Sequence, residues 1–381
     1  MMAGPLSGVT IVEMQGIGPA PFCGMVLSDL GAEVIRIDRA QRAPAEPPAR
    51  PPLDVLARGR RSIAVDLKHA RGVEAVLKLL DGADGLIEGF RPGVMERLGL
   101  GPDTCLARNE RLVYGRMTGW GQDGPYASMA GHDINYIALA GCLAHLGRAG
   151  QAPTPPINLI GDFGGGGMLL AVGMLAGLFE ARGSGRGQVV DAAMVDGAAL
   201  LMAPFNGLAS INRLQPRGMN GTDTGAHYYD AYECADGEYI SIGSIEPQFY
   251  AGLRRLAQLD GPLWDDQLDR ATWPERKEAI AGIFRTKSRA EWCALMEGSD
   301  VCFAPVLTID EAWEHPHNVE RATFTEVAGI RQPRPAPRFS RTDGEVAGPP
   351  SFPGQHTDEV LARLGLSDSD IAELRASGAV R

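Results

Sequence analysis

Residues 9–38, VTIVEMQGIGPAPFCGMVLSDLGAEVIRID, decide the fold class because they contain a complete strand–helix–strand unit. The apolar run 9–14 predicts a buried strand, residues 22–30 predict a helix that ends at Gly31, and residues 33–38 predict a second strand. The same alternation continues, with strands expected at 62–67, 85–90, 112–119 and 188–194 and helices at 71–80 and 164–180. Strands that alternate with helices predict an α/β fold with a doubly wound parallel sheet.

The pattern changes after residue 211, which predicts a second domain. Residues 195–211 are typical of one apolar helix, and residues 227–244 alternate with period two around a turn at Ala235-Asp236-Gly237, as a β-hairpin does. We therefore expect a large domain at 1–211, a linker at 212–225 and a smaller α+β domain at 226–322. The remaining segment, 323–381, is expected to complete the large domain through a Pro- and Arg-rich arm at 331–353 and two short helices within 357–379.

The composition disfavours several classes of function. The net charge of −11 argues against a nucleic-acid-binding surface. None of the six cysteines has CxxC spacing or lies near a histidine at metal-ligand spacing, so we expect free thiols, no metal and a cytoplasmic location. The N-terminus lacks the pattern of a signal peptide, and the most apolar stretch, 168–179, is too short to span a bilayer, so no membrane partner is expected.

The first predicted strand–helix turn resembles a dinucleotide-binding fingerprint, but it departs from the pattern at two positions. Gly16 and Gly18 follow the strand, and Asp38 ends the next strand about twenty residues later. Pro21 occupies the place of the third glycine, and Pro19 removes a backbone amide that a pyrophosphate would use. These departures disfavour a nicotinamide cofactor.

Basic residues follow several of the predicted strands. Arg39, Lys68 and Arg91 each lie where a strand ends, and Arg97 follows shortly after Arg91. An isolated arginine or lysine in a loop is usually solvated. A doubly wound sheet, however, binds ligands at the carboxyl ends of its strands, so these residues together favour a phosphorylated ligand.

Three further residues are candidates for proton chemistry. His132, between a glycine and an aspartate, fits either an oriented base or a capping side chain. Asp162 is expected to open the long apolar helix, where it can be an N-cap, a catalytic group or both, and the helix N–H groups there would bind an oxyanion. Glu246, just before a proline, fits a surface carboxylate as well as a functional one.

At these residues the sequence resembles the family III CoA-transferase superfamily and, within it, the branch of acyl-CoA racemases. The likeness runs over nearly the whole chain. Its most specific pieces are Asp38-Arg39, Glu88–Gly93 (EGFRPG), Thr118–Gly121 (TGWG), Gly131–Tyr136 (GHDINY), Gly161–Gly165 (GDFGG) and Ile245–Phe249 (IEPQF).

The resemblance implies a homodimer of interlocked subunits, each with a Rossmann-like large domain that binds CoA. The CoA contacts that it implies are Arg39, Val65, Asp66, Leu67, Lys68, Gly89, Phe90, Arg91, Arg97, Gly131, Asp133, Ile134, Asn135 and Tyr136. It also implies that His132, paired with Glu246, acts on one face of the substrate α-carbon and that Asp162 acts on the other. Because Glu246 lies in the smaller predicted domain, we expect it to meet His132 of the partner subunit.

The implied reaction is racemisation of a 2-methyl-branched acyl-CoA by proton transfer through an enolate, with CoA as part of the substrate and no cofactor. In the transferase branch, the aspartate that matches Asp162 is a nucleophile that forms an acyl anhydride, and this alternative stays open. The His132 context favours the racemase, because it supplies a second proton carrier. The loops at 40–60 and 212–226 leave the acyl chain undecided.

Overall fold

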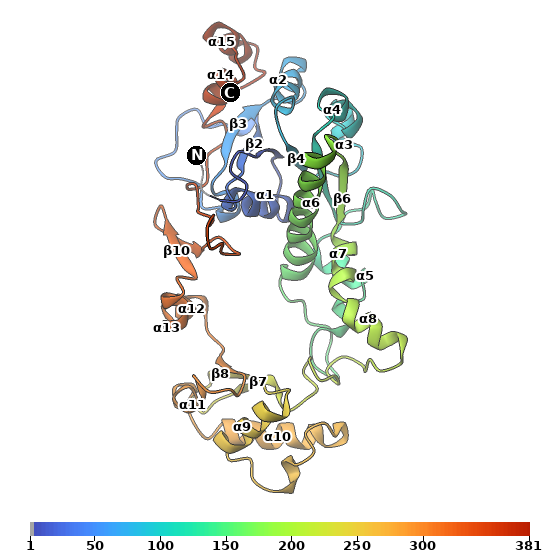
Figure 1. Cartoon of the computed structure of the whole chain (residues 1–381), viewed down its shortest axis with the longest axis vertical. Coiled ribbons are helices and arrows are strands. Elements are labelled where there is room, and N and C mark those ends of the chain that lie inside the picture. Colours follow the sequence, from blue (N-terminus) through green and yellow to red (C-terminus); the bar gives the residue numbers. More distant parts are fainter. Residues whose placement is uncertain (1–3) are drawn as a thin grey trace. The chain divides into compact units, whose positions relative to one another are not determined.

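The computed structural model describes residues 4–381, which form two compact units (Figure 1). The large unit contains Met1–Ala140, Ile157–Leu201 and Ala322–Arg381. The small unit contains Gly141–Pro156 and Met202–Arg321.

A six-stranded parallel sheet forms the centre of the large unit, and its strand order is β3-β2-β1-β4-β5-β6. The strands are β1 (Thr10–Met14), β2 (Glu33–Arg39), β3 (Arg61–Val65), β4 (Gly85–Glu88), β5 (Val113–Thr118) and β6 (Val189–Ala193). This order is that of a doubly wound, Rossmann-like sheet, so the predicted α/β class and its strands are confirmed. The chain reverses direction across the sheet between β1 and β4, which is where such folds bind ligands.

Both faces of the sheet are covered, because side chains along each strand alternate between two cores. Ile11, Val34 and Ile87 pack with α1 (Pro19–Asp29) and α6 (Leu169–Ser184). Val12 and Ile35, on the other face, pack with the helices α2 (Ala70–Leu80), α3 (Val94–Arg97), α4 (Pro102–Arg108), α14 (Thr357–Arg363) and α15 (Asp368–Ala376).

The long apolar helix begins earlier than the sequence predicts. It starts as a π-helix, η4 (Leu159–Met168), and continues without a break into α6 as one segment of 26 residues. Its length and composition would suffice to cross a membrane, but it contributes Leu170, Met174 and Leu178 to the core against β5. It therefore behaves as a core helix on that face.

The predicted single helix at 195–211 is wrong, because the structure has two helices there. These are α7 (Met194–Leu201) and α8 (Ala203–Ser210), and Pro204 lies in the first turn of the second one. A proline cannot donate the backbone hydrogen bond that a continuous helix needs, but it is tolerated in a first turn.

The C-terminal segment belongs to the large unit. The hairpin of β10 (Phe324–Val327) and β11 (Ile330–Pro333) comes first, and the two predicted terminal helices follow as α14 and α15. Ser367 caps α15 by accepting the N–H of Asp370. Val380 forms a bridge with Val65, so the end of the chain lies against the edge strand β3.

The small unit is built on a three-stranded sheet of β7 (Tyr229–Glu233), β8 (Tyr239–Gly243) and β9 (Phe303–Pro305). The β7–β8 hairpin is the predicted one, and Gly237 supplies the positive φ of +80° that its turn requires. Four helices of eight or fewer residues and two longer ones also belong to this unit: α8, α9 (Pro247–Leu256), α10 (Trp273–Phe284), α11 (Arg289–Met296), α12 (Ile309–Glu314) and α13 (Pro316–Glu320).

The boundary between the units differs from the predicted 1–211 and 226–322. Residues 141–156 and 202–225 belong to the small unit. Arg217 donates to the carbonyl oxygen of Ala144 at 2.8 Å, and Arg148 pairs with the buried Asp230 at 2.8 Å. These long-range polar contacts attach both segments to the small unit, and sequence periodicity gives no sign of them.

Candidate active site

A cavity of about 510 Å³ lies at the carboxyl ends of β1, β4 and β5, where the sheet reverses its winding. The loops that follow these strands form its wall, together with the start of α5 (Asp133–Leu139) and the first turn of η4. We call it the carboxyl-edge cavity. Its titratable lining side chains are Arg91, His132, Tyr136 and Asp162.

The loop after β1 faces Asp162 and is poorly suited to a pyrophosphate. Gly18 has φ of +69°, and a Cβ built on it would lie 3.5 Å from Asp162 Oδ2. Asp38, which would have to bind a ribose, is buried and accepts bonds from Arg36 Nε at 2.7 Å and Ser62 Oγ at 2.6 Å. The side chain of Asp38 is therefore already engaged, which strengthens the case against a dinucleotide site.

The loop after β4 is fixed by a buried carboxylate. Glu88 is 1% exposed, accepts the N–H of Phe90 at 2.7 Å and pairs with Arg116 at 2.9 Å. Burial raises the pKa of Glu88, and the bonds from Phe90 and Arg116 oppose that shift. This network holds the loop so that the exposed Arg91 reaches the cavity.

His132 lies at the N-cap of α5 and its side chain is exposed. The Asn135 side-chain oxygen accepts the His132 N–H at 3.0 Å, and the His132 carbonyl accepts the N–H of Asn135 at 2.8 Å. These bonds fix the backbone of His132, and its exposed side chain lines the cavity, where a partner or a substrate can reach it.

Asp162 is not an N-cap, which was one of the roles that the sequence left open for it. The helix begins at Leu159, so Asp162 lies inside its first turn, half-buried, with Asn158 Nδ2 donating to its Oδ2 at 3.0 Å. Its backbone N–H donates to Asp133 Oδ1 at 2.7 Å. The Asp133 carboxylate therefore occupies this N–H, so it is not among the helix N–H groups that could bind an oxyanion.

Aromatic rings close one side of the cavity. Trp120 lies edge-on to Tyr136 at 4.7 Å and to Tyr126 at 5.3 Å between ring centroids. A Cβ on Gly119 would come within 2.1 Å of the Tyr136 ring, so only glycine permits this packing. Burial first, and then the charge of Asp162, raises the pKa of Tyr136, while Arg91 opposes the shift. The Tyr136 phenol consequently stays protonated at neutral pH.

The structure brings seven of the seventeen predicted site residues together in this cavity. The predicted residues that line it are Gly89, Phe90, Arg91, Gly131, His132, Tyr136 and Asp162. Asp133 and Asn135 lie beside it and are used in bonds to its backbone. Asn158, Trp120 and Gly18 also line it without having been predicted, although the four-residue spacing from Asn158 to Asp162 is a signal for such a contact.

Other predicted residues lie on the same edge of the sheet but outside the cavity. Arg39 ends β2 with its side chain exposed, Lys68 follows β3, and Arg97 ends α3. Val65 is 1% exposed and packs in the core, so only its backbone can meet a ligand. Asp66, Leu67 and Ile134 are also outside the lining.

Glu246 belongs to the small unit. It is exposed, at the N-cap of α9, two residues after the buried Ser244, whose hydroxyl donates to the carbonyl oxygen of Val301. Within residues 4–381, the structure contains no cluster of three or more His, Cys, Asp and Glu side chains that could hold a metal ion.

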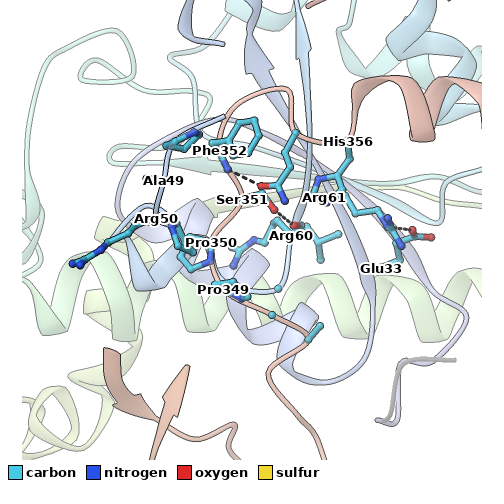
Figure 2. A pocket seen from close by; sticks show the side chains of 17 residues that line it. Glu33, Ala49, Arg50, Arg60, Arg61, Pro349, Pro350, Ser351, Phe352 and His356 are labelled. Atoms are coloured by element: carbon cyan, nitrogen blue, oxygen red, sulfur yellow. Dashed lines mark hydrogen bonds and ion pairs between the residues drawn. The ribbon is translucent and has the colours of Figure 1, made fainter. Parts of the chain in front are cut away.

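A second cavity, of about 480 Å³, lies at the opposite, amino edge of the same sheet (Figure 2). Glu33 and Arg61, which begin β2 and β3, line it together with the proline-rich segments 48–51 and 347–352. Arg61 pairs with Glu33 at 2.9 Å, and the Ser351 hydroxyl donates to the Arg60 carbonyl at 2.6 Å. We call it the amino-edge cavity, and its bonds attach the C-terminal segment to the sheet.

A doubly wound sheet with an arginine, a histidine and an aspartate in a cavity at its switch point is the arrangement expected of an enzyme that binds an anionic ligand. The model of the family described as CoA-transferase family III matches residues 6–357. The chain belongs to this family.

Individual proteins of known name or structure are also similar to this chain. Over 375 residues the chain is 46% identical to mouse alpha-methylacyl-CoA racemase, covering 97% of this chain and 96% of that protein. It is 42% identical to the human alpha-methylacyl-CoA racemase over 378 residues, with the same coverage. The crystal structure of Rv3272 from Mycobacterium tuberculosis matches with a TM-score of 0.77 and 30% identity, covering 94% of this chain and 99% of that one.

Proposed function

We propose that the protein is an isomerase that racemises 2-methyl-branched acyl-CoA thioesters. The observation that carries the proposal is that His132 and Asp162 line one cavity beside Arg91, at the switch point of the sheet. The identity to the two racemases, at 46% and 42%, supports the same activity. A thioester α-proton is only weakly acidic, so the reaction needs two proton carriers and a bound enolate.

The two carriers act on opposite faces of the α-carbon. His132 removes the proton from one enantiomer, the C–H electrons pass into the enolate, and protonated Asp162 delivers its proton to the other face. The roles reverse for the other enantiomer. An acid–base side chain contributes about 10²–10⁴ in rate. Because Asp133 occupies the Asp162 N–H, other donors have to bind the enolate oxygen.

Binding of CoA places the acyl carbon between the two carriers. Arg91 reaches the cavity, and Arg39, Lys68 and Arg97 lie on the same edge of the sheet, where their positive charge can meet the CoA phosphates. The proposal includes a cytoplasmic location, no nucleic-acid or membrane partner, and no cofactor beyond the CoA of the substrate.

Transfer of CoA through an anhydride on Asp162 is the second candidate. Its support is that the chain is also 30% identical, over 390 residues, to a protein described as probable fatty acyl-CoA transferase Rv3272. Incubation of one enantiomer of a 2-methylacyl-CoA in D2O separates the two functions. We expect deuterium at the α-carbon and racemisation with no acceptor present. Exchange of CoA that requires an added carboxylate, and a hydroxylamine-trapped adduct on Asp162, would favour the transferase.

We also propose a homodimer of interlocked subunits that completes each site. The segment η4–α6 has a row of exposed apolar side chains, Leu159, Met168, Val172 and Phe179, which are 43–83% exposed in the single chain. Such a row favours coverage by another copy. In the dimer, Glu246 of one subunit meets His132 of the other and orients its imidazole.

Complementation tests the shared site. His132→Ala and Glu246→Ala chains, each inactive, are co-expressed so that mixed dimers form. Pairing between subunits gives one site with both defects and one with neither, so about half of the activity per dimer returns. Pairing within one chain leaves a defect in each site, and verified mixed dimers without recovery would contradict the shared site.

A further inference from the structure

Asp133 connects the two proposed proton carriers. It follows His132 directly in the chain, and its Oδ1 accepts the backbone N–H of Asp162 at 2.7 Å. The N–H of Gly161 donates to the same carboxylate. The residue is 6% exposed, so these bonds are shielded from water. One residue is thus covalently joined to His132 and hydrogen-bonded to the turn that holds Asp162.

The contact is tightly packed. A Cβ on Gly161 would lie 2.6 Å from Asp133 Oδ1, so any other residue at that position would force the carboxylate to shift. A Cβ on Gly166, one turn later, would lie 2.9 Å from the Gly161 carbonyl oxygen. The first turn of η4 therefore has little freedom to shift while the Asp133 carboxylate is in place.

A buried carboxylate is an unfavourable acceptor for a hydrogen bond that has only a structural role. Burial raises the pKa of Asp133, and among residues 4–381 its second oxygen, Oδ2, is buried with no hydrogen-bond partner. Such unfavourable groups persist where a function depends on them, which points to a role in the site next to it.

We propose that Asp133 is a positioning residue that sets the distance between His132 and Asp162 through the Asp162 backbone, without touching the substrate. The inference rests on the proposed two-carrier mechanism. Loss of the Asp133 acceptor frees the first turn of η4, and a displacement of about 1 Å in a catalytic group costs about 10²-fold in rate. The backbone of His132 keeps its separate bond to Asn135, so the loss falls on Asp162.

An effect on Asp162 can be told apart from an effect on His132, because proton return by each carrier gives a different product. With the enantiomer that His132 deprotonates, in D2O, His132 can exchange its proton with solvent and return deuterium to the same face, which gives exchange with retention. Asp162 can instead deliver deuterium to the opposite face, which gives inversion. Asp133→Ala should lower inversion by about 10–100-fold and lower exchange with retention far less. From the other enantiomer, both products should fall together.

Three variants make the test specific. Asp162→Ala gives the reference pattern of lost inversion. Asp133→Asn keeps an acceptor oxygen and should keep the wild-type ratio of inversion to exchange. Asp84→Ala removes a comparable bond, from the Thr10 N–H at 2.8 Å, ahead of β4 at the amino edge, and should lower the melting temperature without changing the ratio.

Gly161→Ala leaves Asp133 intact but pushes its carboxylate away, so it should reproduce the Asp133→Ala pattern even where Asp133→Ala does not fold. If Asp162→Ala loses inversion selectively while Asp133→Ala and Gly161→Ala keep the wild-type ratio, the positioning role is overturned and the proposed function stands. If Asp162→Ala itself keeps the wild-type ratio, the roles of the two carriers fail, and the inference fails with them.

Discussion

The two cavities of the large unit lie on opposite edges of one sheet and have similar volumes, about 510 and 480 Å³. They differ in how their polar groups are used. At the amino edge, Arg61 pairs with Glu33, and His356 Nδ1 accepts the N–H of Ser62 at 3.1 Å. At the carboxyl edge, His132 and Arg91 are exposed to the cavity, and hydrogen bonds fix the backbone around them. The two cavities therefore differ in how their polar side chains are used and not in size.

The largest effect should come from exchanging the histidine of each cavity. His132→Gln removes a proposed proton carrier, so kcat/KM for racemisation should fall by about 10²–10⁴-fold. His356→Gln removes an imidazole that accepts a backbone hydrogen bond far from the proposed site, so kcat/KM should change by no more than about twofold. Both variants are assayed with each enantiomer, after circular dichroism confirms folding. Equal losses in the two variants would remove the difference between the cavities.

The second largest effect should come from replacing the exposed arginine of each cavity, Arg91 at the carboxyl edge and Arg50 at the amino edge. Arg91→Ala removes a proposed contact with a CoA phosphate, so KM should rise about tenfold while kcat stays nearly constant. The KM of Arg91→Ala should also depend less on ionic strength than the wild-type KM, because fewer charges contact the ligand. Arg50→Ala, at the amino-edge cavity, should leave KM unchanged. A loss confined to kcat in Arg91→Ala would assign that arginine to the chemical step.

How far the sequence predicts these regions depends on the range of the interactions. The unit at 9–38 and the hairpin around Gly237 were predicted correctly because local patterns determine them. Asp162 was placed at a helix start because its neighbours are small and apolar, but the π-helix begins three residues earlier and Asp133 binds the turn from 29 residues away. Periodicity contains no information on such a contact. The sequence also failed to predict that residues 141–156 belong to the small unit, for the same reason.

A smaller effect on kcat is expected from replacing the side-chain amide of each cavity, Asn158 at the carboxyl edge and Gln355 at the amino edge. Asn158 donates to Asp162 Oδ2 at 3.0 Å, so Asn158→Ala should lower kcat about fivefold, the value of one exposed hydrogen bond of about 1 kcal/mol. Gln355 accepts the N–H of Phe352 at 3.2 Å, and Gln355→Ala should leave kcat unchanged. The measurement is kcat at saturating substrate, and an unchanged value for Asn158→Ala would show that Asp162 keeps its orientation without this donor.

The smallest effect concerns the pH dependence of stability, where the two edges should differ in sign. The hydrogen bond from Arg363, with further help from Arg61, lowers the pKa of Glu33 below its usual value. The folded state then binds fewer protons than the unfolded one, so Glu33 stabilises the fold above its unfolded pKa, and that stability is lost as pH falls through the lowered pKa. Burial instead raises the pKa of Asp133, so the folded state binds more protons and stability falls as pH rises through the window above the unfolded pKa.

Neutral variants should therefore shift the melting temperature in opposite directions at pH 7. Glu33→Gln should lower it, because a favourable charge is lost, and the difference from wild type should shrink as the pH approaches 3. Asp133→Asn keeps the acceptor for the Asp162 N–H and removes a poorly solvated charge, so it should raise the melting temperature or leave it unchanged. Melting curves from pH 3 to 7.5 test both. A lower melting temperature for Asp133→Asn at pH 7, with the difference from wild type vanishing at pH 3, would mean that the Asp133 charge itself stabilises the fold.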